Sequence, residues 1–434
     1  MGNPEDSERN AGAIIVGVRT GTVTDEDLDE QLTELAALLK TLDIPVAGRL
    51  VQKRAKPDVS SLLGRGKVAE LKSLAELKGA GLIVFDQSLT PTQTRNLEKL
   101  TCTDVLDRTG VILEIFFRHA RSGQAKTQVE IARLEYMLPR LSGAWTHFQR
   151  QAGGGVRSRG MGEKQIEIDR RRARQRITRL QRQLEQIARE TRNRSKGRAG
   201  EFRVALVGYT NSGKTTLMRA LTRTHTDGKD ELFATLDTSI KIIDPGTRPR
   251  ILISDTVGFI RNLPHGLVES FRSTLEEVSE ADLLLHVVDV SHPGFREQMN
   301  TTREVLGEIG AGHVPEMLIF NKTDQVEDEA TLRVLKSAYP RCIQVSAHSE
   351  SDVRQLRERV VRTFRRDMVR GSIVLDQRDR KGISLVHRSC VVLDEDYSEE
   401  GQVRFTLEAT PAVMARLKNH VNQTVMRSRM ENGS

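Results

Sequence analysis

Residues 208–216 carry the strongest chemical signal of the chain, a glycine-rich stretch that runs directly into a lysine and two threonines. The stretch fits the pattern G-x-x-x-x-G-K-[ST] and reads Gly208-Tyr209-Thr210-Asn211-Ser212-Gly213-Lys214-Thr215-Thr216. Apolar residues 204–207 precede it and predict a strand. A strand that ends in such a turn before a helix directs several backbone N–H groups at one anion. We predict a phosphate-binding loop in which Lys214 reaches the β- and γ-phosphates and the Thr215 hydroxyl binds Mg²⁺.

A second predicted strand, residues 250–254, ends in the pattern D-x-x-G with Asp255 and Gly258. At the carboxyl end of a strand beside the phosphate loop, the Asp255 carboxylate can hold Mg²⁺ through a water. The Gly258 N–H can sense whether a γ-phosphate is present. By itself an Asp-Gly turn after a strand is common, so this motif counts only together with the others.

The third and fourth motifs select the base. Residues 317–320 predict a strand that leads into Asn321-Lys322-Thr323-Asp324. The Asp324 carboxylate can accept from the guanine N1–H and amino group together, a donor pair that adenine lacks. Ser346 and Ala347 follow another short apolar run, and their small side chains let a backbone N–H approach the guanine carbonyl oxygen. We therefore predict that Asn321, Lys322, Asp324, Ser346 and Ala347 bind the base of GTP or GDP.

The order and spacing of the four motifs indicate a fold. Lys214 precedes Asp255 by 41 residues, Asp255 precedes Asn321 by 66, and Asn321 precedes Ser346 by 25. Each motif ends a strand, and ligands of a doubly wound parallel sheet bind outside the carboxyl ends of its strands. We predict a P-loop GTPase domain of the α/β class.

Hydrolysis requires a mobile switch between the first two motifs. Residues 225–238 fit this role, and one threonine there should complete the Mg²⁺ shell; we favour Thr235, with Thr238 as the rival. Phe259 stands directly after Gly258, where many GTPases have a water-orienting Gln. An apolar ring cannot orient water, so we expect slow intrinsic hydrolysis that a partner accelerates. The residues expected to carry catalysis are Lys214, Asp255, Gly258 and Thr235.

The composition limits where the protein can act. No run of 18 apolar residues exists, so no membrane span is expected. Cys102, Cys342 and Cys390 are too scattered for a disulfide framework or a zinc site. No secretory signal opens the chain. We expect a monomer in a reducing cytoplasm.

The net charge of +8 is concentrated in one stretch. Residues 163–200 contain 13 Lys/Arg and 5 Asp/Glu, so their net positive charge equals that of the whole chain. Apolar residues recur there at helical spacing: Ala173, Ile177, Leu180, Leu184 and Ile187. The stretch is either a solvated coiled-coil face or an amphipathic helix that binds a polyanion, and the uneven sign favours RNA as the partner. We expect Arg170, Arg171 and Arg172 to contact RNA.

A glycine-rich segment, residues 151–163, precedes this helix and contains Arg157 and Arg159. It is either a flexible linker or a loop at the tip of a helical hairpin that enters a narrow RNA cleft. The two arginines favour RNA contact.

Five parts of the chain are expected. They are a flexible N-terminus (1–11), an N-terminal α/β domain (12–120), a basic helical hairpin with the glycine-rich loop (121–200), the GTPase domain (201–368) and a small α+β C-terminal domain (369–434). In the N-terminal domain, residues 13–18 and 82–86 predict strands, and 27–40 a helix. Residues 63–67 resemble a phosphate loop but lack its full spacing, so we interpret them as a turn into a helix.

Several sequence blocks together resemble the HflX family of ribosome-associating GTPases. Besides the nucleotide motifs, they are Leu63-Gly64-Arg65-Gly66-Lys67, Asp107-Arg108-Thr109-Gly110, Gln128-Val129-Glu130, Leu134-Glu135-Tyr136, Pro139-Arg140-Leu141, Gly153-Gly154-Gly155, Arg159-Gly160-Met161-Gly162-Glu163 and Glu167-Ile168-Asp169-Arg170-Arg171. The likeness covers residues 12–368. Ser212 and Lys164 differ from the residues expected there, without affecting the chemistry.

The resemblance implies a stress-related GTPase that binds the large ribosomal subunit and splits stalled or idle ribosomes, with hydrolysis resetting the factor. The N-terminal domain and the glycine-rich loop would approach the peptidyl-transferase region. The residues alone leave two alternatives: a ribosome-assembly GTPase, and an RNA-binding or remodelling protein whose affinity GTP regulates.

Overall fold

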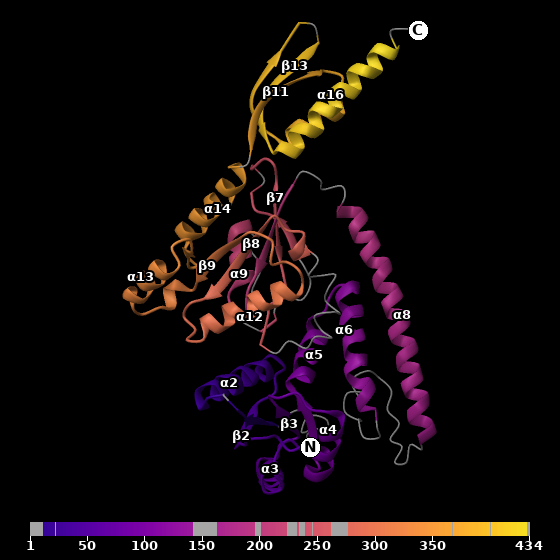
Figure 1. Ribbon diagram of the computed structural model, residues 1–434, viewed down its shortest axis with the longest axis vertical. Helices are drawn as coiled ribbons and strands as arrows, with labels where there is room; N and C mark the ends of the chain where they lie inside the picture. The colour runs from indigo at the N-terminus through magenta and orange to yellow at the C-terminus, as the bar shows by residue number, and fades with distance from the viewer. Residues whose placement is uncertain are drawn as a thin grey trace, which may run out of the picture. The chain divides into compact units, whose positions relative to one another are not determined.

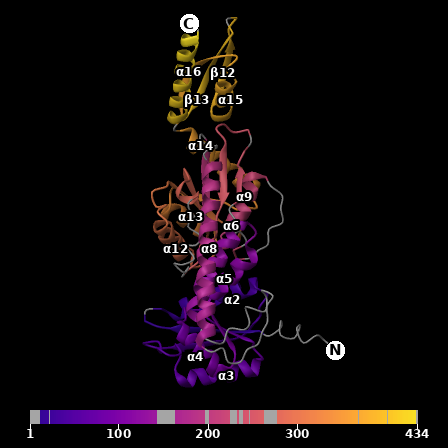
Figure 2. The ribbon, with the colours of Figure 1, turned by 90° about the vertical axis from the view of Figure 1, so that its right-hand side faces the viewer.

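The computed structural model describes residues 12–21, 23–141, 163–195, 201–223, 232–233, 239–244, 246–261, 277–366, 368–399 and 401–431 (Figures 1 and 2). The chain divides into two compact units. The first unit is Met1–Arg189 with Asp230–Leu236 and Asn262–Phe271, and the second is the remainder. Of the predicted features, residues 1–11, Arg157, Arg159, Thr235 and Thr238 lie outside the described residues.

The first unit is built on a four-stranded parallel sheet of order β2-β1-β3-β4. Its elements are β1 (Ala13–Arg19), α2 (Asp25–Thr41), β2 (Val46–Lys53), α3 (Arg65–Lys78), β3 (Leu82–Phe85), α4 (Pro91–Thr101), β4 (Asp104–Asp107) and α5 (Arg108–His119). Residues 13–18 are buried throughout, as expected for a strand covered on both faces. The predicted strands and the helix over 27–40 are confirmed, and residues 63–67 do lead into a helix, α3.

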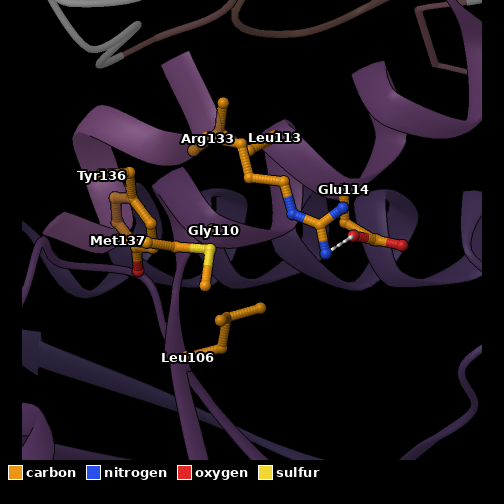
Figure 3. Close-up of a pocket in the computed structure, with 7 residues that line it drawn as sticks. All are labelled: Leu106, Gly110, Leu113, Glu114, Arg133, Tyr136 and Met137. Atoms are coloured by element: carbon orange, nitrogen blue, oxygen red, sulfur yellow. Dashed lines mark ion pairs between the residues drawn. The ribbon is translucent and has the colours of Figure 1, made fainter. Parts of the chain in front are cut away.

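Asp107 joins four segments of the first unit. Its carboxylate caps α5 by accepting from Gly110 N at 3.0 Å, and it also accepts from Leu89 N at 3.0 Å and the Tyr136 hydroxyl at 2.8 Å. Arg140 completes the set with an ion pair of 3.3 Å. Tyr136 belongs to α6 (Gly123–Met137) and Arg140 to the short η1 (Leu138–Arg140), and a small pocket lies between α5 and α6 (Figure 3). Segments that are distant in sequence thus meet at the buried Asp107 carboxylate.

Helix α8 (Glu163–Ser195) spans 33 residues and carries the predicted basic stretch. It packs on α6 through a cluster of Ile131, Ile177 and Leu180, with Leu134 and Leu184 partly buried at its margin. A bidentate ion pair between Arg176 and Glu130 lies beside this cluster. The predicted apolar stripe is therefore confirmed at its centre. It is narrow, because most of the α8 side chains between residues 166 and 190 are exposed.

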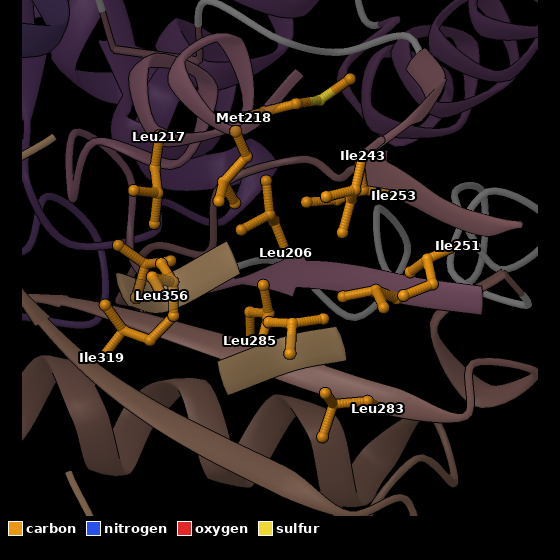
Figure 4. Close-up of a cluster of buried hydrophobic side chains, with 14 of the residues drawn as sticks. Leu206, Leu217, Met218, Ile243, Ile251, Ile253, Leu283, Leu285, Ile319 and Leu356 are labelled. Carbon is orange, nitrogen blue, oxygen red and sulfur yellow. The ribbon is translucent and has the colours of Figure 1, made fainter. Parts of the chain in front are cut away.

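The second unit contains a six-stranded sheet of order β10-β9-β8-β5-β7-β6. Its elements are β5 (Phe202–Val207), α9 (Lys214–Thr222), β6 (Ser239–Ile242), β7 (Ile251–Asp255), β8 (Leu283–Asp289), α12 (Phe295–Glu308), β9 (Glu316–Asn321), η3 (Thr323–Gln325), α13 (Glu329–Ala338), β10 (Ile343–Gln344) and α14 (Glu350–Arg365). Figure 4 shows the apolar core that α9, α14 and the sheet share. The predicted doubly wound α/β fold is confirmed.

One strand departs from the predicted parallel arrangement. β6 pairs antiparallel with β7, with Ser239 opposite Asp255. Only residues 243–250 connect the two strands, and a parallel crossover needs a dozen residues or more. The short connection therefore makes β6 an antiparallel edge strand.

The last described part of the second unit is a three-stranded antiparallel sheet of order β11-β13-β12. Its elements are β11 (Val369–Asp376), α15 (Arg380–Ser389), β12 (Val391–Tyr397), β13 (Gln402–Ala409) and α16 (Pro411–Glu431). The α+β pattern agrees with the prediction, although the sequence analysis did not predict β11 or α15. In β11 only Ile373 and Leu375 are fully buried, so its apolar alternation is too short to identify a strand. Among the described residues, no helix is long and apolar enough to cross a membrane.

Candidate nucleotide site

The phosphate loop connects the end of β5 to the start of α9. Gly213 precedes α9 with a φ of +90°, a left-handed conformation that favours glycine. Lys214 begins the helix and is 6% exposed. Its Nζ donates to the carbonyl oxygens of Gly208 at 3.0 Å and Tyr209 at 2.7 Å. Because an ammonium has three donors, these bonds fix its direction and leave a donor for an anion.

Burial sets the electrostatics of this lysine. Desolvation lowers the pKa of Lys214 to about 8, and the nearby Asp255 carboxylate only partly opposes that shift. A phosphate group beside the ammonium would favour its charged form and raise the pKa again. Binding of an anion and protonation of Lys214 would therefore favour one another.

Thr215 and Asp255 provide the oxygens that suit Mg²⁺. The Thr215 hydroxyl donates to Asp255 Oδ2 at 2.7 Å, and Asp255 is 1% exposed at the end of β7. Over the described ranges, no three His, Cys, Asp or Glu side chains gather in a way that could hold a metal. Mg²⁺ in phosphate sites usually takes one or two protein oxygens and completes its shell with phosphates and waters. The Thr215–Asp255 pair fits this chemistry.

The Asn321 side chain connects the segment predicted to bind the base with the phosphate loop. Its Nδ2 donates to the Ser212 carbonyl at 2.9 Å, and its Oδ1 accepts from Ala347 N at 3.1 Å. A Cβ atom on Gly213 would lie 2.2 Å from Asn321 Nδ2, so only glycine fits there. Three of the predicted motifs thus meet at the buried Asn321 side chain. The sequence did not predict that Asn321 would connect them.

Asp324 is the residue predicted to read the base. It follows β9 in η3, its side chain is exposed, and within the described parts of the chain it makes no hydrogen bond or ion pair. Its neighbour Lys322 has a φ of +61° and pairs with Asp289 at 2.6 Å. Asp289 ends β8, and the sequence did not predict its contact with Lys322, although an Asp closing the mostly apolar run 283–288 was a usable signal. Ser346 N donates to Asp352 at 2.9 Å, which fixes the fourth motif.

The predicted RNA-contact residues lie apart from these motifs in the chain. Arg171 and Arg172 are exposed on α8 and Arg170 is half-buried, with Arg172 3.9 Å from Asp169. The structure therefore presents these three arginines on one helix. Arg157, Arg159 and the switch threonines belong to the undescribed segments.

Parallel strands that present a phosphate loop, a Thr–Asp pair and an open carboxylate at their carboxyl ends are the architecture of P-loop GTPases. The chain is an enzyme of this class and hydrolyses GTP.

Comparison with known proteins identifies the family. Three family models match successive regions: the GTP-binding GTPase N-terminal region over residues 29–117, the GTP-binding GTPase middle region over 119–198, and a 50S ribosome-binding GTPase over 203–322. The GTPase HflX of Gluconacetobacter diazotrophicus is 43% identical, covering 94% of this chain and 97% of that protein. The GTPase HflX of Escherichia coli is 36% identical, covering 91% and 93%. The chain belongs to the HflX family of GTPases.

A solved structure, a GTP-binding protein from Sulfolobus solfataricus in complex with GDP, is 25% identical. It aligns with a TM-score of 0.42 over 80% of this chain and 99% of that one.

Proposed function

We propose that this GTPase binds the large ribosomal subunit in the cytoplasm as a monomer, splits stalled or idle ribosomes during stress, and is reset by GTP hydrolysis. The observation that carries the proposal is the exposed arginine face of α8, in a chain whose GTPase domain matches a family described as 50S ribosome-binding. Ribosomal RNA is the polyanion that such a face would recognise.

At the nucleotide site, the residues of the phosphate loop, 208–216, would bind the phosphates, with Lys214 neutralising the β- and γ-phosphate charge. Thr215 and Thr235 of the switch would bind Mg²⁺ directly and Asp255 would hold it through a water, and the ion would neutralise charge that develops on the phosphates during hydrolysis. The Gly258 N–H would contact the γ-phosphate. Asp324 would read guanine, with Lys322 along the base and Ser346 and Ala347 near its carbonyl oxygen.

Phe259 supports the proposal that a partner accelerates hydrolysis. Its side chain is 1% exposed, so it lies in the protein interior and cannot orient an attacking water. The ribosome is the partner that would complete the catalytic arrangement. Arg157, Arg159, Arg170, Arg171 and Arg172 would contact ribosomal RNA, the first two near the peptidyl-transferase region.

The test is GTP hydrolysis by the pure protein, alone and with intact ribosomes, while light scattering follows subunit separation. We expect stimulated hydrolysis together with splitting that depends on GTP. Stimulation without splitting would favour the ribosome-assembly alternative. No response to ribosomes would favour the alternative of a GTP-regulated protein that acts on free RNA.

A further inference from the structure

The segment that follows Asp255 is attached to the phosphate loop by backbone hydrogen bonds. Tyr209 and Phe259 form an isolated parallel bridge. Phe259 N donates to the Gly208 carbonyl at 3.1 Å, and Thr210 N donates to the Phe259 carbonyl at 2.6 Å. This bridge joins the phosphate loop directly to the backbone around Phe259.

A side chain of the phosphate loop adds a third attachment. The Tyr209 hydroxyl accepts a hydrogen bond from Arg261 N at 2.8 Å, and Tyr209 is 6% exposed. The Arg261 guanidinium also pairs with Glu297 of α12. Residues 258–261 are thus held from both sides, on one side by Tyr209 and on the other by α12.

These attachments determine where Gly258 lies. A Cβ atom on Gly258 would be 2.8 Å from Thr210 Cα and 3.1 Å from Lys214 Nζ. The Gly258 backbone therefore packs directly beside the ammonium that is expected to bind the γ-phosphate. The two groups that a γ-phosphate must contact together are brought side by side by the protein's own hydrogen bonds.

We propose that Tyr209 is a positioning residue that favours GTP over GDP by holding Gly258 beside Lys214. The inference rests on the proposed assignment of both residues to the phosphates. A group that is already ordered loses little conformational entropy when its ligand binds. GDP has no γ-phosphate and does not use Gly258, so the Tyr209 hydroxyl should matter for GTP alone.

The experiment is Tyr209→Phe, which removes the acceptor and keeps the ring. Dissociation constants are measured for GDP and for a GTP analogue with an imido group between the β- and γ-phosphorus atoms. We expect the analogue to bind about three- to tenfold more weakly, as for loss of one hydrogen bond, and GDP to bind within about twofold of the unmodified protein.

Two further variants accompany it. Tyr397→Phe removes a hydroxyl from the exposed strand β12, where the hydroxyl contacts Glu395, and should change neither constant. Glu297→Gln weakens the other attachment of residues 258–261 without altering the phosphate loop. It should reduce affinity for the analogue in the same direction and by less. It also keeps the test available if Tyr209→Phe does not fold.

Three outcomes would overturn the inference: equal weakening of both nucleotides, no change in either, or tighter binding of the analogue. Equal weakening would assign Tyr209 a merely structural role. The variant Lys214→Ala separates this failure from failure of the proposed site. If the Lys214→Ala variant binds both nucleotides normally, the phosphate assignment itself is wrong. If it binds neither, and Tyr209→Phe changes the affinities for GDP and for the analogue equally or not at all, only the inference about Tyr209 is wrong.

Discussion

The phosphate loop and helix α8 both present positive charge, but they hold it in opposite ways. Lys214 is 6% exposed, and two backbone carbonyls direct its ammonium. On α8, the Arg172 and Arg189 side chains are 73% and 80% exposed and lie 3.9 and 3.7 Å from carboxylates of their own helix. A buried, directed charge selects a small anion by geometry, whereas an exposed row of charges attracts any polyanion in a salt-dependent way. Substitutions in the two regions should therefore have different signatures.

The largest effect is expected from Lys214→Ala. Loss of a buried charge partner costs about 2–5 kcal/mol, so affinity for both GTP and GDP should fall at least about thirtyfold and hydrolysis should be lost. Titration with a fluorescent guanine nucleotide measures the change. Arg171→Ala on α8 is the matched control and should bind nucleotide normally. Normal affinity in the lysine variant would refute the phosphate-loop assignment.

Asp324→Asn tests recognition of the base, at the end of the nucleotide opposite the phosphates. An amide offers a donor where the carboxylate only accepts, so the preference should shift from guanine to xanthine, whose edge carries an additional carbonyl oxygen. We expect about a hundredfold loss for GDP, because a site that hydrogen-bonds its ligand rejects an unpaired analogue strongly. Competition between GDP and xanthosine diphosphate measures it. An unchanged preference would remove Asp324 from the base-reading role.

The lowered pKa of Lys214 predicts proton uptake on nucleotide binding. With a pKa of about 8 in the free protein, the lysine is half deprotonated at pH 8. Bound phosphates favour the charged form, so binding should take up about half a proton at pH 8 and more at higher pH. Affinity should then fall as the pH rises above 8, by up to about tenfold per unit. Calorimetry in buffers of different ionisation enthalpy measures the uptake; no uptake at pH 8 would show that the lysine stays charged.

Replacing Arg170, Arg171 and Arg172 together by Gln tests the exposed region and should have the smallest effect. We expect about tenfold weaker binding to ribosomes and a shallower salt dependence, its slope reduced by about one for each phosphate that is no longer neutralised. Nucleotide affinity should not change. Binding at several salt concentrations checks this, and the exposed Gln175→Ala on the same helix serves as control. An unchanged salt slope would contradict RNA contact by α8.

The nucleotide motifs could be predicted from the sequence because each motif is local. A glycine-rich turn between a strand and a helix needs no distant partner to be read. The contacts that assemble the motifs could not be read in this way. The Tyr209 hydroxyl and Arg261 N are 52 residues apart, and Asn321 and Ser212 are 109 apart. Nothing in local periodicity specifies such tertiary contacts.

The orientation of strand β6 could not be predicted from local sequence either. Its orientation depends on the length of the connection to β7, and the sequence pattern of residues 239–242 is too short to establish a strand. The stripe on α8 was easier to predict, because helical spacing alone identifies it. Its narrow contact with α6, through Ile177 and Leu180, became evident only with the neighbouring helix in place.

Asn321 has a consequence for which nucleotides the pocket can accept. Since its amide bonds both the Ser212 carbonyl and Ala347 N, the phosphate loop and the residues proposed to bind the base are held at one separation. Under the proposed assignment, the site would select its ligand by molecular length as well as by chemical identity. A guanine compound whose spacer between base and phosphates is too short or too long can fill one end but not both. Such a site would distinguish guanine nucleotides from other phosphate esters of different length.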